Sequence, residues 1–233
     1  MQNISIVSVD MFQTLVDVSS RRHCLWKRIL DKEYSAQLAE EYWNWATELI
    51  FKNYDDLFRW GKEFISCRGI MEISFRELFS EVGLNLDPET GAQVLVEEHG
   101  WSSPYEDTKI FFEKVGKSFP ICVVSDADAD MIQPLEDLYA FDRVFISEEH
   151  QAYKGSPGSS FFKAVVEHYG VQPEEILHIG DSKHDVLGAD RVGLQSCWLN
   201  RKGLAWPSQE APPVHTVTVT SLQEAAALLE KKT

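Results

Sequence analysis

The stretch formed by residues 4–17 constrains the fold more than any other part of the chain. Residues 4–9 form a short, nearly charge-free run rich in β-branched side chains, which is typical of a strand buried on both faces of a parallel sheet. The run ends at Asp10. In open α/β sheets ligands bind beyond the carboxyl ends of the strands, so a carboxylate at this position is well placed for chemistry. The alternative is an aspartate that only caps the following turn.

An alternation of helices and strands resumes after residue 105 and continues to the C-terminus. Strands separated by helical segments indicate an α/β fold, a doubly wound parallel sheet with right-handed crossovers. Beyond the first strand, the predicted strands are residues 121–124, 143–146, 176–179, 196–199 and 215–219. The predicted helices are residues 108–115, 131–139, 160–169 and 186–192, with a terminal helix after residue 221.

The segment between the first strand and this alternation has helical patterns and no strand pattern. From Leu38 to Leu49 apolar residues recur at steps of four, three and four, which forms one helical stripe. Ser74 begins a stretch with capping-box spacing, and Asp87 followed by proline is typical of a helix start. We therefore predict an α-helical cap inserted after the first strand. The predicted domains are a core of residues 1–18 and 99–233 and a cap of residues 19–98.

Composition excludes several partners. The formal net charge of −15 argues against nucleic acid and against an anionic membrane surface. No apolar run approaches the roughly 20 residues that span a bilayer, and the N-terminus lacks the basic flank of a signal peptide. The four cysteines are widely spread without a CxxC pair, as expected for reduced thiols in a cytoplasmic protein.

Polar residues stand at or shortly after the ends of the predicted strands. Asp10, Ser125 and Asp181 end three strands, Lys154 follows another in a loop, and Asp185 lies four residues beyond Asp181. Because a parallel sheet brings the carboxyl ends of its strands to one edge, we expect these groups to converge.

Each of these groups has a natural role in phosphoryl transfer. Asp10 can attack phosphorus to form an aspartyl-phosphate. Asp10 and Asp181 can hold Mg²⁺, which prefers oxygen ligands and offsets the repulsion between nucleophile and phosphate. Ser125 and the amides after it can bind a phosphate oxygen, and Lys154 can neutralise transition-state charge. These roles predict a small, anionic substrate.

The same residues resemble the four motifs of the haloacid dehalogenase-like hydrolases. The motifs correspond to DMFQTL at residues 10–15, Ser125, Lys154 and GDSKHD at residues 180–185, in the family's order and spacing. The resemblance covers nearly the whole chain and implies a Rossmann-like core with a helical cap. It also implies that the backbone carbonyl of Phe12 and the carboxylate of Asp185 complete the metal site. We expect Thr14 and Asp126, which lie within or beside the motifs, to contact the substrate.

Phe12 departs from the phosphatase pattern. Phosphatases of the family carry at this position a second aspartate, which protonates the leaving group, whereas phenylalanine cannot move a proton. General acid–base catalysis typically contributes about 10²–10⁴-fold, so its loss matters most for alkyl phosphates. The main functional prediction is therefore a Mg²⁺-dependent phosphatase with an altered proton-transfer step.

Two other activities stay open, together with a catalytically weak phosphate-binding or regulatory protein. Hydrolytic dehalogenases of the family carry an aromatic residue at the position of Phe12, work without metal, and lack the Gly-Asp of the fourth motif that this chain retains. They hold the substrate with an arginine early in the cap. A third branch cleaves carbon–phosphorus bonds with a cap lysine. The candidate cap residues for the dehalogenases are Arg21, Arg22, Arg28 and Arg59. Those for the branch that cleaves carbon–phosphorus bonds are Lys52 and Lys62. We predict His178, within a strand, to be a core histidine.

Overall fold

The computed structural model describes residues 3–59, 63–158 and 160–230. The chain divides into two compact units. The core unit comprises Met1–Asp17, Pro104–Asp126 and Glu136–Thr233, and the helical unit comprises Val18–Ser103 and Ala127–Leu135.

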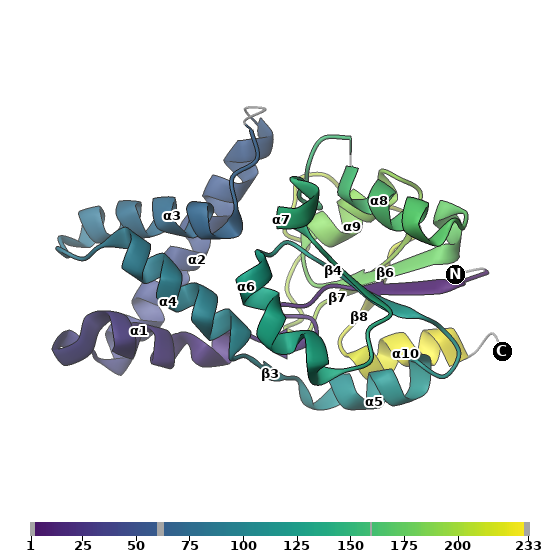
Figure 1. Cartoon of the computed structure of the whole chain (residues 1–233), viewed down its shortest axis with the longest axis horizontal. Coiled ribbons are helices and arrows are strands. Elements are labelled where there is room, and N and C mark those ends of the chain that lie inside the picture. Colours follow the sequence, from purple (N-terminus) through teal and green to yellow (C-terminus); the bar gives the residue numbers. More distant parts are fainter. Residues whose placement is uncertain (1–2, 60–62, 159, 231–233) are drawn as a thin grey trace. The chain divides into compact units, whose positions relative to one another are not determined.

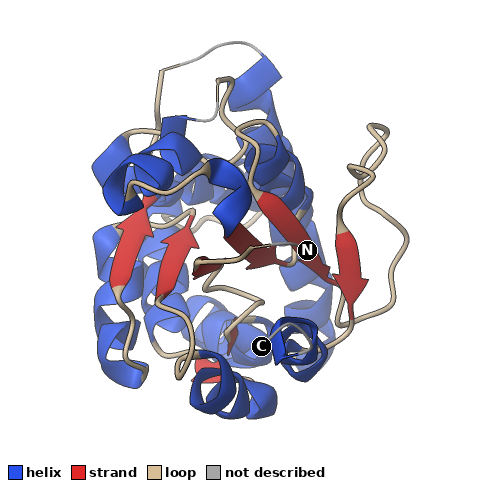
Figure 2. Cartoon of the chain, turned by 90° about the vertical axis from the view of Figure 1, so that its right-hand side faces the viewer, coloured by secondary structure: helices blue, strands red, loops and turns tan. Residues whose placement is uncertain are grey.

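Within the described residues, the core unit contains a six-stranded sheet in the order β5-β4-β1-β6-β7-β8 (Figures 1 and 2). All neighbouring strands are parallel, which confirms the predicted fold class. The central strands β1, β4 and β6 are buried along their whole length, which explains their apolar, β-branched sequences. The strands are β1 (Ile6–Val9), β4 (Ile121–Ser125), β5 (Arg143–Ile146), β6 (Ile176–Gly180), β7 (Gln195–Leu199) and β8 (Val217–Val219).

Helices cover both faces of this sheet, as a doubly wound fold requires (Figure 1). Phe161 and Phe162 of α8 pack in one core cluster with Cys122 and Val124 of β4. On the other side of the sheet, α5 and α10 pack against each other. The helices of this unit are α5 (Glu106–Val115), α7 (Ser147–His150), α8 (Ser160–Tyr169), α9 (Lys183–Asp190) and α10 (Leu222–Glu230). Two short strands, β2 (Val16–Asp17) and β3 (Ser103–Pro104), lie where the chain leaves and re-enters the core unit.

The helical unit is built around a buried tryptophan. The ring of Trp26 makes edge contacts with Tyr42 and Phe75, at centroid distances of 5.3 and 5.9 Å. The predicted helix start at Asp87 is confirmed, since its carboxylate accepts hydrogen bonds from two backbone amides of the first turn. The helices are α1 (Arg22–Leu30), α2 (Ala36–Arg59), α3 (Cys67–Val82), α4 (Pro88–Gly100) and α6 (Ala129–Ile132).

The predicted capping box at Ser74 is wrong. Ser74 is buried in the interior of α3 and donates a hydrogen bond to the carbonyl of Ile70. The helix begins after Ser66, whose hydroxyl accepts a hydrogen bond from the amide of Gly69. The local spacing at Ser74 was overridden because α3 extends its apolar face over a longer stretch than the pattern suggested.

Residues 127–135, which we expected in the core, group with the helical unit. The carboxylate of Asp128 accepts hydrogen bonds from the backbone amides of Cys67 and Arg68, at 2.9 and 2.7 Å, and so ties this segment to the start of α3. The predicted helix at residues 131–139 is also shorter, because α6 gives way to a 3₁₀ turn at Gln133–Leu138. Pro134, which has no N–H, interrupts the helical hydrogen bonding there.

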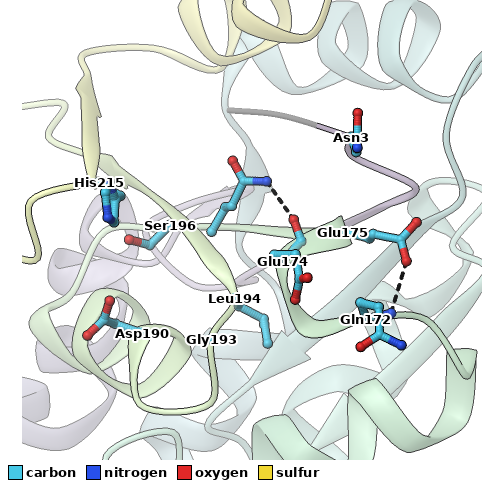
Figure 3. Close-up of a pocket in the computed structure, with 10 residues that line it drawn as sticks. Asn3, Gln172, Glu174, Glu175, Asp190, Gly193, Leu194, Ser196 and His215 are labelled. Carbon is cyan, nitrogen blue, oxygen red and sulfur yellow. Dashed lines mark hydrogen bonds between the residues drawn. The ribbon is translucent and has the colours of Figure 1, made fainter.

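A cavity of about 920 Å³ lies at the amino-terminal edge of the sheet (Figure 3). Its lining includes Glu174 and Glu175, which precede β6, and Gln195, which begins β7. The side-chain amide of Gln195 donates to the carbonyl of Glu174. The cavity contains none of the predicted site residues, which lie at the opposite edge. Among the described helices, none is long and apolar enough to cross a membrane.

Candidate active site

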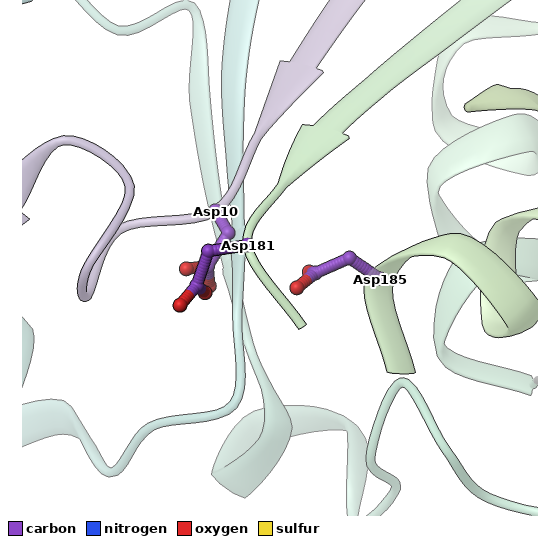
Figure 4. Close-up of side chains that lie close together, drawn as sticks. All are labelled: Asp10, Asp181 and Asp185. Atoms are coloured by element: carbon purple, nitrogen blue, oxygen red, sulfur yellow. The ribbon is translucent and has the colours of Figure 1, made fainter. Parts of the chain in front are cut away.

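Three neighbouring strands deliver polar groups to the same edge of the sheet. Asp10 directly follows β1, Ser125 is the last residue of β4, and Asp181 directly follows β6. Because β1 lies between β4 and β6, the three residues meet where these strands end. Figure 4 shows Asp10 and Asp181 side by side, with the carboxylate of Asp185 pointing toward them from α9.

Lys154 links two of the carboxylates. Its Nζ lies 2.7 Å from Oδ1 of Asp10 and 2.5 Å from Oδ1 of Asp185. Asp10 Oδ1 also accepts a hydrogen bond from the Ser125 hydroxyl at 3.3 Å. All four residues are buried. The exposed fraction is 3% for Lys154 and 4% for Asp10. The structure therefore brings together the predicted nucleophile, lysine and serine in one buried network.

The ionisation of the charged groups at this edge of the sheet is perturbed. Burial raises the pKa of Asp10 to about 7, although the ammonium of Lys154 works in the opposite direction. Burial works against the charged form of Lys154, but Asp10 and Asp185 outweigh it and hold the lysine pKa well above its ordinary value. Burial and the charges of Asp10 and Asp185 raise the pKa of Asp181. Such shifts cluster at functional sites.

Asp185 is the most firmly held carboxylate. Burial disfavours its ionisation, but Lys154 and His178 outweigh this effect and hold the pKa of Asp185 well below its usual range. Its Oδ2 accepts hydrogen bonds from the backbone amide and the hydroxyl of Ser182, at 2.9 and 2.5 Å. Gly180 leaves room for this carboxylate, since a Cβ at that position would lie 2.2 Å from Asp185 Cγ.

The three carboxylates do not fit the predicted magnesium site well. Asp10, Asp181 and Asp185 each offer an oxygen within 4.8 Å of the others, as a cation site requires. However, Oδ1 of Asp185 already binds Lys154 and His178, and its Oδ2 binds Ser182. A cation at Oδ1 of Asp185 would compete with the ammonium of Lys154, which bridges this oxygen and Oδ1 of Asp10.

The remaining predicted residues surround this network. Phe12 is half-buried in the loop after β1 and forms an isolated backbone bridge with Val16. Thr14 is fully buried in the same loop. Asp126 accepts a hydrogen bond from the backbone amide of Lys154 at 2.9 Å, and so shapes the lysine loop. Substrate contact by Thr14 and Asp126 stays a prediction.

Sequence reasoning missed a set of interactions, centred on Arg201, that stabilises the loop after β1. The guanidinium of Arg201 makes two hydrogen bonds to Asp107, at 3.0 and 2.9 Å, and a third to the carbonyl of Thr14 at 2.9 Å. It lies 4.0 Å from the ring centroid of Tyr105, whose hydroxyl donates to the side chain of Gln13. Gln13 has a φ of 61°, a conformation that needs such support in a residue other than glycine. No local pattern pointed to Arg201, because its partners are distant in sequence.

His178 is more than a core histidine. It is buried in β6, as predicted, but its Nε2 lies 2.9 Å from Asp185 Oδ1 and its Nδ1 lies 2.9 Å from the hydroxyl of Ser8. Burial lowers the pKa of His178, although Asp185 works in the opposite direction. The signal that could have identified it was an ionisable residue inside an apolar strand, two positions before a motif.

The early arginines of the helical unit bind carboxylates of the same unit. Arg21 and Arg28 both form ion pairs with Glu98, which is buried, at 2.7 and 2.9 Å. Arg22 pairs with Glu40 at 2.6 Å. Of the candidate lysines, Lys52 lies 3.5 Å from Glu77. The side chain of Arg59 and all of Lys62 lie outside the described residues.

Comparisons with known proteins agree with this geometry. The family model of the haloacid dehalogenase-like hydrolases matches residues 4–193. An (S)-2-haloacid dehalogenase of Pseudomonas fluorescens is 25% identical over 229 residues, which cover 93% of each chain. A glyceraldehyde 3-phosphate phosphatase of Pyrococcus furiosus is 23% identical over 240 residues, covering 100% of this chain and 95% of the phosphatase. The structure of an L-2-haloacid dehalogenase from Xanthobacter autotrophicus superimposes with a TM-score of 0.81 at 19% identity, covering 99% and 100% of the two chains.

These findings correct two predictions. The Mg²⁺-dependent phosphatase was wrong as the main function, because two (S)-2-haloacid dehalogenases match 93% of this chain at 25% identity, above the 23% identity of the phosphatase. Mg²⁺ was predicted as part of that activity and is not supported, since the dehalogenase branch described above works without metal. The physical reason is visible at Phe12, which offers no proton for an alkoxide leaving group. The chain belongs to the haloacid dehalogenase-like hydrolases.

Proposed function

We propose that the protein is a metal-independent dehalogenase that hydrolyses the carbon–halogen bond of a small 2-haloacid, with Asp10 as the nucleophile. One observation carries the proposal: Oδ1 of Asp10 accepts hydrogen bonds from Lys154 and Ser125, while position 12 offers no acid. A halide leaves with the bonding electrons and needs no proton. The similarity to (S)-2-haloacid dehalogenases supports the same substrate class.

In the first step Asp10 displaces the halide. Both hydrogen bonds to this carboxylate reach Oδ1, so Oδ2 is the oxygen that attacks C2 of the substrate. The new bond joins Oδ2 to C2, the carbon–halogen bond breaks, and the product is an ester of Asp10. Carboxylates act as covalent nucleophiles in this way in other hydrolytic enzymes.

In the second step water hydrolyses the ester. Water adds to Cγ of Asp10, and negative charge develops on Oδ1, which already accepts hydrogen bonds from Lys154 and Ser125. Donors that are in place before the charge develops stabilise such a transition state. The Cγ–Oδ2 bond then breaks, Oδ2 takes up the proton that was removed from the water, and the 2-hydroxy acid leaves with Oδ2. The oxygen of water becomes part of Asp10.

Asp181 is the carboxylate we assign as general base for this water. It lies beside Asp10 (Figure 4), whereas both oxygens of Asp185 are already bound by Lys154, His178 and Ser182. Burial and its acidic neighbours raise the pKa of Asp181, and a base of raised pKa suits proton transfer near neutral pH.

Two coarser assignments accompany this activity. We propose that the inserted helices form a cap that determines which 2-haloacid is accepted, because the core supplies the reacting groups and the insert is a separate compact unit. We also propose a cytoplasmic location, in line with four widely spaced cysteines in an acidic chain.

Chloride release from each enantiomer of 2-chloropropionate tests the proposal, with and without EDTA. The wild-type protein should release chloride equally in both conditions, and Asp10→Asn should release none. A single turnover in H₂¹⁸O should place the heavy oxygen in the peptide that contains Asp10. Asp181→Asn should slow ester hydrolysis, so that the mass of the substrate acyl group remains on the same peptide.

Three outcomes would contradict the proposal. The first is a lack of chloride release from either enantiomer, and the second is chloride release that EDTA abolishes. The third is a first turnover that labels the hydroxy acid and leaves Asp10 unlabelled, because water would then have attacked the substrate directly.

A further inference from the structure

A pair of buried polar side chains extends the network beyond Asp185 into the sheet. Ser8 of β1 and His178 of β6 are neighbours in the parallel register, and both are at most 1% exposed. The Ser8 hydroxyl lies 2.9 Å from His178 Nδ1, and His178 Nε2 lies 2.9 Å from Asp185 Oδ1. Buried polar groups in a sheet interior are costly unless they are fully hydrogen-bonded, which these are.

The partners of the imidazole determine its tautomer. An ionised Asp185 can only accept, so Nε2 of His178 carries the proton that it donates. Nδ1 is then an acceptor for the hydroxyl proton of Ser8. The ring of Phe162 packs edge-on against the imidazole at a centroid distance of 4.8 Å, which restricts its rotation.

We propose that His178, anchored by Ser8, is a positioning residue that orients Asp185 so that Asp185 holds the Lys154 ammonium against Asp10. The hydrogen bonds run without a gap from Ser8 through His178, Asp185 and Lys154 to Asp10. The inference rests on the proposed function only in taking Asp10 as the nucleophile.

The geometry shows what the histidine adds. Ser182 holds Oδ2 of Asp185, while Lys154 and His178 share Oδ1. Without His178, Oδ1 has only the end of a flexible lysine chain as a partner, and Asp185 is held by the protein backbone through Oδ2 alone. With His178, a ring mounted on a buried strand fixes Oδ1, and Lys154 is aligned by a carboxylate that cannot rotate.

Three variants and a matched control test this role through chloride release from 2-chloropropionate. His178→Leu keeps most of the volume and removes both hydrogen bonds, so we expect kcat to fall by up to about 100-fold, the effect of a displacement near 1 Å, with KM less affected. His178→Gln places an amide donor near the position of Nε2 and should recover most of this loss. Ser8→Ala removes the anchor and should have an intermediate effect.

Ser196→Ala is the control. Ser196 is the other strand neighbour of His178 and is also buried, but its hydroxyl bonds to Thr216 and not to the imidazole. Its kcat should equal that of the wild type. If His178→Leu and Ser196→Ala behave alike, or if His178→Gln is as slow as His178→Leu while both variants stay folded by circular dichroism, the positioning role is refuted.

A measurement without substrate separates this inference from the proposed function. In protein labelled with ¹⁵N in histidine and lysine, NMR should show the Nε2–H tautomer for His178 and a slowly exchanging ammonium signal for Lys154. That signal should broaden or vanish in His178→Leu and persist in His178→Gln and Ser196→Ala. An Nδ1–H tautomer, or a Lys154 signal unchanged in His178→Leu, would overturn the inference even in an active dehalogenase. The expected spectra would support it even if no haloacid is turned over.

Discussion

Replacing Asp10 by asparagine is expected to stabilise the fold at neutral pH while it abolishes halide release. Burial raises the pKa of this carboxyl from its ordinary value of 3.8 to about 7 in the folded protein. Between about pH 4 and pH 7 the unfolded chain loses this proton while the folded chain keeps it, so Asp10 makes the wild-type protein less stable as the pH rises. Asparagine carries no such charge and has no such dependence.

The magnitude follows from the size of the shift. At about 1.4 kcal/mol for each pH unit, the rise from 3.8 to about 7 corresponds to about 4 kcal/mol. The Lys154 ammonium is already included, because it lowers the pKa that burial raises. The free energy of unfolding of Asp10→Asn minus that of the wild type should therefore increase by about 4 kcal/mol between pH 4 and pH 8, with most of the change below pH 7.

Urea unfolding of both proteins across this pH range measures the difference, in which the titration of distant groups cancels. Glu175→Gln is a control of opposite sign, because hydrogen bonds from Gln172 and Ser5 lower the pKa of Glu175. Glu175 therefore stabilises the fold above its unfolded pKa, and its glutamine variant should lose stability relative to the wild type as the pH rises. A flat or falling difference for Asp10→Asn would refute the reasoning, because Asp10 would then be fully ionised in the folded state at acidic pH.

Three further predictions concern the same network. The rate of the first halide-releasing turnover should be low at pH 5, half-maximal near pH 7 and constant at higher pH, because only the ionised Asp10 is a nucleophile. Stopped-flow halide detection measures this rate, and a rate that is constant down to pH 5 would contradict the prediction. Lys154→Met should lower the free energy of unfolding by about 3–5 kcal/mol at pH 8, because it leaves buried carboxylates uncompensated; urea unfolding tests this, and a loss below 1 kcal/mol would contradict it. Gly180→Ala would place a methyl group 2.2 Å from Asp185 Cγ, so we expect it to cost about 1–3 kcal/mol and to reduce kcat; an unchanged melting temperature and kcat would show that Asp185 is free to move.

The sequence alone determined the fold class and the position of the reacting groups. The buried strands β1, β4 and β6 follow from short, mostly apolar runs rich in β-branched residues, because both faces of such a strand are covered by the protein. The convergence of Asp10, Ser125 and Asp181 follows in turn, since parallel strands end at one edge. These inferences succeed because they depend on local composition and on a general property of parallel sheets.

Only the tertiary structure decided how the groups at that edge are connected. Ser8 and His178 are 170 residues apart, and their hydrogen bond depends on a strand register that no local pattern contains. The same holds for Lys154, whose ammonium reaches Asp10 across 144 residues. A local pattern also misled at Ser74, where capping-box spacing occurs inside a helix that tertiary packing extends in both directions. The physical reason is the same in each of these cases. Which distant segments come into contact depends on the packing of the whole chain, and a local sequence pattern does not contain this information.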